Sequence, residues 1–205
     1  MGQISFLAKP ESWLAIVTAG TAVVAIWQTR RQARLSNKHQ LFDRRLEKYI
    51  LIKELVLTFS RVRGTINKRV NLEVNNRFIL RSLMENDALR DVLWVVEKPT
   101  SESALNTIHE KFRWLGKLSE ELQFLFKDDD IQIITKFIDS YKNLLLWLQR
   151  YNSHSVLTEG TDFGKDYKEK VKTKVIEISS EMEQQLQTIN NKHILDNLAK
   201  QIKLK

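Results

Sequence analysis

Three consecutive aspartates form the densest cluster of potential metal ligands in the sequence. Asp128, Asp129 and Asp130 offer carboxylate oxygens, which Ca²⁺ and Mg²⁺ prefer. Consecutive residues do not converge on one face of a helix, however, and no EF-hand spacing of Gly and Glu follows them. Negative charge at the start of a helix is stabilised by the helix dipole. We therefore interpret the three aspartates as the beginning of a helix rather than as a metal site.

The four histidines are separated too widely in the sequence to form a recognisable metal or catalytic motif. His109 and Glu110 begin the zinc-protease pattern HExxH, but Arg113 occupies the position of the second His. The other three, His39, His154 and His193, have no second histidine at ligand spacing. We expect ordinary surface or core imidazoles at all four positions.

Phosphate loops and activated nucleophiles are also missing. The segment 160–165, GTDFGK, has three residues between its glycines and an Asp after its Lys, so it departs from the phosphate-loop pattern GxxxxGK[ST]. The sequence has no GxSxG elbow, and the absence of Cys excludes disulfides, thiol catalysis, Cys-bound zinc and iron–sulfur clusters. The sequence therefore predicts a protein that is not an enzyme, with no catalytic, cofactor-binding or metal-binding residues and no cofactor.

Positive charge is concentrated between residues 28 and 81, where 14 Lys/Arg accompany 4 Asp/Glu. Such a stretch can contact nucleic-acid phosphates or anionic lipid headgroups, or form a solvated helix face. Aromatic interleaving is poor because Phe42, Tyr49 and Phe59 fall on the apolar stripe, and no recognised nucleic-acid module is present. Lipid contact or a solvated face is therefore favoured over nucleic acid.

An uncharged apolar segment, residues 12–29, comes immediately before this basic stretch. As a helix it would extend about 27 Å, close to the ~30 Å hydrocarbon core of a bilayer. Tryptophans at both ends suit the two headgroup levels. We predict a membrane-spanning helix; a buried core helix and a cleaved signal peptide are the alternatives. The predicted anchor residues are Trp13, Leu14, Ile16, Val17, Val23, Val24, Ile26 and Trp27.

Basic residues flank the predicted span on one side only. Arg30, Arg31, Arg34 and Lys38 follow it, whereas Lys9 alone precedes it. The positive-inside rule therefore predicts that residues 1–11 lie outside the cytoplasm and that the large C-terminal part lies inside it. The same four cations would contact anionic lipid or act only as a topology signal.

Small residues recur four apart within the predicted span, as in Ala15–Ala19 and Thr18–Ala22. This spacing allows close packing of helices in lipid. We expect a homo-oligomer, with these residues as candidate contacts between spans.

The remainder of the chain predicts amphipathic helices. Gly and Pro number only 6 and 2, which argues against an all-β fold. Apolar residues at helical spacing predict an all-α protein, with a span over 12–29, a basic stalk over 30–40 and a helical bundle over 41–205. The expected helices cover 28–64, continuous with the span, then 77–97, a third beginning after Ser101, a fourth opened by the aspartates, and 165–203. The last is long enough for a coiled-coil contact, and 92–96 is β-branched enough for a short strand.

Two short segments carry a resemblance to a known group of proteins. Leu41 to Tyr49, LFDRRLEKY, has the form LFxxRxxxY, and Phe124–Leu125–Phe126 comes just before the aspartates. In these features the chain resembles small uncharacterised bacterial membrane proteins that have an N-terminal span and a basic stalk. The resemblance implies the same arrangement in a bacterial inner membrane, and it brings no activity or cofactor. Arg45 and Tyr49 share a helix face, so we expect them to anchor the stalk to the bundle.

These expectations favour a membrane-anchored interaction, scaffold or signalling protein with an unidentified protein partner. Two other functions stay open. One is an oligomer that perturbs the membrane, as an effector in phage defence would. The other is a membrane-tethered nucleic-acid binder.

Overall fold

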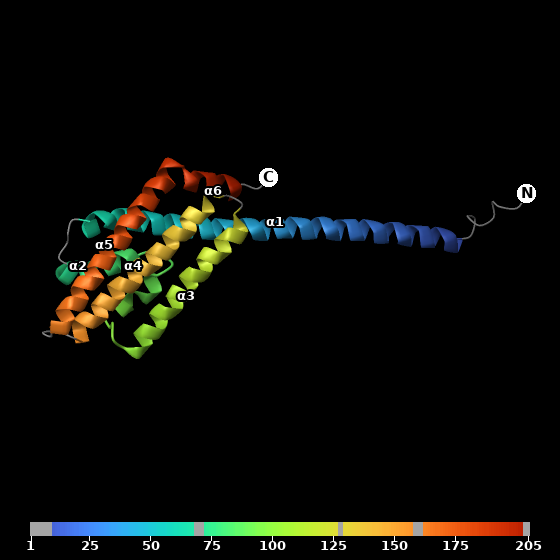
Figure 1. Ribbon diagram of the computed structural model, residues 1–205. Coiled ribbons are helices and arrows are strands. Elements are labelled where there is room, and N and C mark those ends of the chain that lie inside the picture. The colour runs from blue at the N-terminus through green and yellow to red at the C-terminus, as the bar shows by residue number, and fades with distance from the viewer. Residues whose placement is uncertain (1–9, 68–71, 127–128, 158–161, 203–205) are drawn as a thin grey trace, which may run out of the picture. The chain divides into compact units, whose positions relative to one another are not determined.

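The computed structural model describes residues 10–67, 72–126, 129–157 and 162–202. In these residues the fold consists of helices joined by turns, without a strand. Side chains at a few of these helical positions, among them Ala15 and Ile16, lie outside the description. The predicted all-α class is confirmed. The elements are α1 (Pro10–Asn67), α2 (Leu72–Met84), the 3-10 helix η1 (Arg90–Val96), α3 (Glu102–Leu125), α4 (Ile131–Leu157), α5 (Asp162–Asn191) and α6 (Ile194–Ile202) (Figure 1).

Helix α1 is continuous over 58 residues, as the absence of a breaker after Trp27 predicts. The predicted end at Gly64 is wrong, because the helix continues to Asn67. A glycine inside a helix costs only about 1 kcal/mol. Burial of the neighbouring Val62 and Ile66 against the core offsets this cost.

The chain divides into two compact units, Met1–Asp43 and Arg44–Lys203. In the first unit every side chain described between Trp13 and Leu41 is exposed. The hydroxyls of Thr18, Thr21 and Thr29 donate to backbone carbonyls three or four residues earlier, at 2.8–2.9 Å. Such bonds satisfy hydroxyls within the helix itself. Among the described residues, no helix combines the length and the apolar character required to cross a bilayer.

Helix α4 is the centre of the second unit and packs against α2, α3 and α5 (Figure 1). The rings of Phe59 on α1 and Phe137 on α4 meet edge to face, with centroids 5.8 Å apart. Phe137 also lies beside Tyr141, at 6.3 Å between centroids. All three side chains are fully buried, so this aromatic cluster joins α1 to α4.

Tyr141 places a polar atom within this core. Its hydroxyl donates to the Leu83 carbonyl of α2. Burial raises the pKa of Tyr141 above its ordinary value, and a hydrogen bond with Asn86 opposes the rise. The phenol therefore stays protonated and remains a donor to α2.

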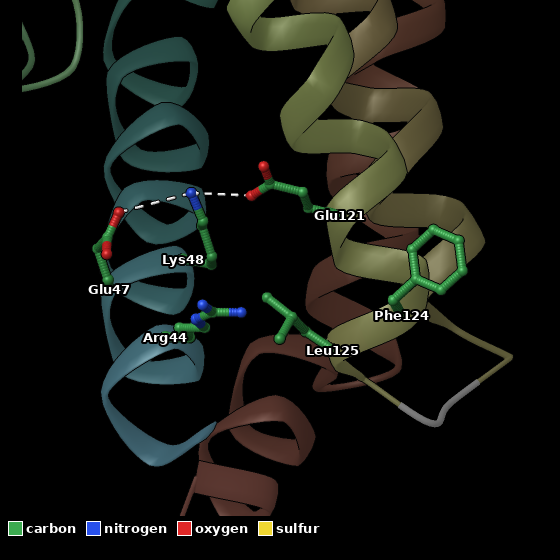
Figure 2. A pocket seen from close by; sticks show the side chains of 6 residues that line it. All are labelled: Arg44, Glu47, Lys48, Glu121, Phe124 and Leu125. Carbon is green, nitrogen blue, oxygen red and sulfur yellow. Dashed lines mark ion pairs between the residues drawn. The ribbon is translucent and has the colours of Figure 1, made fainter. Parts of the chain in front are cut away.

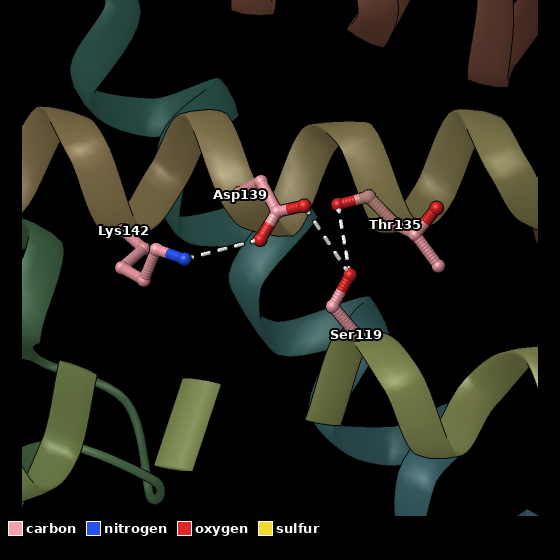
Figure 3. A network of polar contacts seen from close by, with 4 residues as sticks. All are labelled: Ser119, Thr135, Asp139 and Lys142. Atoms are coloured by element: carbon pink, nitrogen blue, oxygen red, sulfur yellow. Dashed lines mark hydrogen bonds and ion pairs between the residues drawn. The ribbon is translucent and has the colours of Figure 1, made fainter. Parts of the chain in front are cut away.

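A second polar contact lies between α3 and α4 (Figure 3). The buried Ser119 hydroxyl donates to the Thr135 carbonyl at 3.4 Å and to Asp139 Oδ2 at 3.5 Å. Asp139 Oδ1 in turn accepts from Lys142 Nζ at 3.3 Å. The long distances indicate weak bonds, but the hydroxyl is satisfied and favours one register between the two helices.

The segment expected as one helix over 77–97 is divided into α2 and η1. Asn86 Nδ2 donates to the Leu83 carbonyl at 2.9 Å, and the Asn86 amide donates to the Met84 carbonyl. Asparagine competes with helix hydrogen bonds in this way, and so it ends α2. The short strand considered for 92–96 is wrong, since these residues belong to η1.

The predicted start of α3 is confirmed, whereas the predicted C-terminal helix is divided in two. Ser101 is the N-cap of α3, as predicted, and its Oγ accepts from the Ala104 amide at 3.3 Å. The helix expected over 165–203 is instead divided into α5 and α6 at His193, which has a φ of 51°. The turn allows Ile194, Leu198 and Ile202 to be buried in the second unit, which outweighs the left-handed backbone of one residue.

Replacing Phe137 with alanine removes the ring shared by α1 and Tyr141. We expect Phe137→Ala to lower the free energy of unfolding by about 3–5 kcal/mol. Phe124→Ala, at a ring that is 87% exposed, should change it by no more than about 0.5 kcal/mol. Urea unfolding of the full chain followed by circular dichroism measures both; equal losses would contradict the assignment of the core.

Candidate functional site

The guanidinium of Arg45 lies at the carboxyl ends of two helices. Its Nε donates to the carbonyl of Leu125 at 2.8 Å, and its Nη1 donates to the carbonyl of Gln201 at 3.2 Å. Leu125 is the last residue of α3, and Gln201 is the residue before the end of α6. The last carbonyls of a helix have no partner within it and carry partial negative charge, so one cation stabilises both ends.

The ring of Phe126 completes this contact. The Arg45 guanidinium carbon lies 6.0 Å from the centroid of the ring, which is buried. The sequence resemblance rests on two segments, 41–49 and 124–126. Arg45 of the first contacts Leu125 and Phe126 of the second. The sequence predicted that Arg45 would anchor its helix to the bundle, but it did not identify α3 and α6 as the partners.

A pocket of about 410 Å³ opens beside Arg45 and is lined by Arg44, Glu47, Lys48, Glu121, Phe124 and Leu125 (Figure 2). Lys48 is its best-buried charge, with 14% of the side chain exposed. Lys48 Nζ lies 3.0 Å from Glu121 Oε2 and 3.5 Å from Glu47 Oε1. The pair Lys48–Glu121 therefore joins α1 to α3 one turn above the Arg45 contact.

The lining of this pocket combines charged side chains with apolar ones. The six residues include no hydroxyl, thiol or imidazole that could act as a nucleophile or proton carrier. Lys48 is occupied by two carboxylates, whereas no ion pair involving Arg44 is recorded among the described residues. What the site presents is one available cation, two carboxylates and an exposed phenyl ring.

Asp129 and Asp130 stand directly before α4, as the sequence predicted. The backbone carbonyls of Asp129 and Asp130 accept from the first turn of α4, and Asp130 Oδ1 pairs with Lys192 Nζ at 2.9 Å. Asp128 lies outside the described residues. No group of three His, Cys, Asp or Glu side chains that could hold a metal ion occurs where side chains are described.

Several cations of the basic stretch are used inside the second unit. Besides Arg45, Arg63 pairs with Glu183 at 3.6 Å, and Arg81 pairs with Glu97 at 3.7 Å. Arg77 Nε donates to Asn152 Oδ1 at 3.2 Å. These contacts are intramolecular, and the side chains of Arg81 and Glu97 remain mostly exposed, so the pair is a weak one.

The predicted anchor residues are exposed wherever they are described. More than half of the surface is exposed in seven of these anchor residues, namely Trp13, Leu14, Val17, Val23, Val24, Ile26 and Trp27. Ile16 and Ala15 lie outside the described side chains. The candidate packing residues Thr18, Ala19 and Ala22 are exposed too, as are the flanking cations Arg30, Arg31, Arg34 and Lys38. Arg31 stacks on Trp27, with its guanidinium carbon 5.5 Å from the ring centroid.

Comparison of the chain with models of protein families, with curated proteins and with solved structures finds no match.

Replacing Arg45 tests the two-helix contact. Arg45→Gln removes the charge and leaves two helix ends without a shared donor, so we expect a loss of about 1–3 kcal/mol in unfolding free energy. Arg45→Lys should recover little, because one ammonium lacks the fork that spans two carbonyls. Arg44→Gln is the matched control and should be neutral. The measurement is urea unfolding together with hydrogen exchange at the ends of α3 and α6, where an unchanged exchange rate in Arg45→Gln would contradict the proposed role.

Proposed function

We propose that this protein is a membrane-anchored, non-enzymatic interaction protein, of the scaffold or signalling kind, whose helical second unit binds other proteins. The N-terminal part of α1 is the anchor, with the N-terminus outside and the second unit in the cytoplasm. By the sequence resemblance, the membrane is a bacterial inner membrane. The observation that carries the proposal is the set of large apolar side chains exposed between Trp13 and Trp27.

Exposed apolar surface of this extent is costly in water. Each large apolar side chain gains about 1.5–3 kcal/mol when it is removed from water, and seven of them lie within one stretch of α1. Soluble monomers rarely leave such a patch uncovered. A helix satisfies its own backbone polar groups, so it can place this stretch in lipid without further partners.

The length of the segment is at the lower limit for a span. Its 18 uncharged residues, 12–29, reach about 27 Å, and three of them, Ser12, Ala15 and Ile16, fall outside the described side chains. Tryptophans at both ends and cations directly after it support insertion across the bilayer. These features favour a spanning anchor over an interfacial helix, which would need a polar face.

The second unit contributes binding surface rather than chemistry. Its pocket is lined by charged and apolar groups and includes no hydroxyl, thiol or imidazole. Arg45 binds the carboxyl ends of α3 and α6, and the last residue of α3, Leu125, also lines the pocket. This supports an interaction domain held close to the membrane.

Extraction from membranes tests the anchor. We expect the full chain to stay with membranes in high salt and in alkaline carbonate, and to be released by detergent. Val23→Arg should release a large fraction without detergent, because a charge near the centre of a span costs about 2.5–3.5 kcal/mol. Ile176→Arg on α5, at a side chain that is also exposed, is the control and should leave partitioning unchanged. Release of the unaltered chain by salt alone would refute the integral anchor.

Topology can be tested with single cysteines, because the chain has none of its own. The asymmetry of flanking Lys/Arg predicts that an impermeant maleimide labels Gln3→Cys in spheroplasts and labels Ser36→Cys only after lysis. Labelling in the opposite order would reverse the orientation. Equal labelling of both positions in intact spheroplasts would argue against a spanning helix.

A further inference from the structure

Phe124 is the most exposed large apolar side chain recorded in the second unit, with 87% of its surface accessible. Leu122 and Phe126, on either side of it in the sequence, are buried. Leu122 on α3 and Phe126 directly after α3 are turned inward, whereas Phe124 points away from the core (Figure 2). A single exposed phenyl ring is ordinary. This one borders a pocket whose other lining residues are mostly charged, which is a less common setting.

The charges around this ring balance. The pocket lining holds two cations, Arg44 and Lys48 of α1, and two carboxylates, Glu47 of α1 and Glu121 of α3. A surface without net charge has little attraction for a uniformly anionic partner such as a nucleic acid or a lipid headgroup layer. Its best electrostatic complement is a surface that carries both signs around an apolar centre. The same surface, rotated by a two-fold axis, has this property.

The balance leaves one charge of each sign available for a partner. Arg44 has no ion pair recorded among the described residues, and the Glu47 side chain is 68% exposed and shares Lys48 with Glu121. In a two-fold arrangement, Arg44 of one copy can pair with Glu47 of the other, and the reverse pair forms by symmetry. The two Phe124 rings then cover each other's pocket, which removes both rings from water.

We propose that the surface formed by Arg44, Glu47, Glu121 and Phe124, here named the Phe124 patch, is the contact through which the second unit binds a second copy of this chain. This deepens the proposed function, because it makes self-association the first interaction of the domain. Anchoring in one membrane raises the local concentration of copies, so a small patch suffices. The higher local concentration rests on the proposed anchor, whereas the argument from the charge and exposure of the Phe124 patch does not.

A cysteine cross-link measures this contact specifically. Glu120 lies one helical turn before Phe124 on the same face of α3, and the chain has no other Cys. In the full chain, in native membranes, Glu120→Cys should give a covalent dimer with a short bis-maleimide. Adding Phe124→Ser should lower the yield at least about tenfold. Adding Phe78→Ser instead, at a phenylalanine 60% exposed on α2, should leave it unchanged.

Charge exchange distinguishes a two-fold contact from a chance collision. In the Glu120→Cys chain, Arg44→Glu alone and Glu47→Arg alone should each reduce cross-linking, because each places like charges opposite one another twice. Mixing these two variants should restore the cross-link between them, because every cross-contact then pairs opposite signs. Glu47 is chosen because its substitution leaves the bridge between Lys48 and Glu121 in place.

Three results would overturn the proposal. They are no covalent dimer from Glu120→Cys, a yield insensitive to Phe124→Ser, and a cross-link to a different protein in place of a second copy. Failure of the anchor is recognised separately. If high salt releases the chain from the membrane but the cross-link still depends on Phe124, the proposed contact is supported and the proposed membrane anchor is refuted.

Discussion

Burial of α4 on several sides at once is the constraint on which the second unit depends. Its apolar residues face α1, α2, α3 and α5, and the aromatic contact of Phe59 with Phe137 fixes the approach of α1. The buried polar side chains of a helix in this position also need hydrogen-bond partners. Tyr141 donates to the Leu83 carbonyl, and Ser119 of α3 donates to Thr135 and Asp139. Apolar burial supplies the stability, and these bonds favour one register.

Helix α1 meets two different demands along one uninterrupted element. In the second unit it buries apolar residues from Ile52 to Ile66, and Arg45 and Lys48 bind groups of α3 and α6. Between Trp13 and Trp27 the large apolar side chains that the structure describes are exposed. The same backbone geometry serves both parts, because helical hydrogen bonds are internal to the segment. The two parts differ in the burial of their apolar side chains, which are exposed in the N-terminal part and buried from Ile52 to Ile66.

The helix content and the starts of α3 and α4 could be predicted from the sequence, because they follow from local signals. Ser101 caps α3, the aspartates precede α4, and no breaker interrupts α1 after Trp27. The errors lie where tertiary burial competes with local preference, as at Gly64 and His193, or where a local side-chain hydrogen bond ends a helix, as at Asn86. Gly64 does not end α1, because its neighbours are buried on both sides. Asn86 ends α2 early, and His193 adopts a positive φ so that α6 can bury its apolar face.

By itself the sequence determined the all-α class, the uncharged segment 12–29, the cations that follow it and the absence of recognisable catalytic motifs. These are properties of composition and short-range spacing, so they can be read without coordinates. Only the tertiary structure decided that Arg45 binds the ends of α3 and α6, and that Glu121 and Phe124 join Arg44 and Lys48 around one pocket. Backbone carbonyls accept the Arg45 bonds, and every residue has one. No residue type could therefore mark the partners in advance.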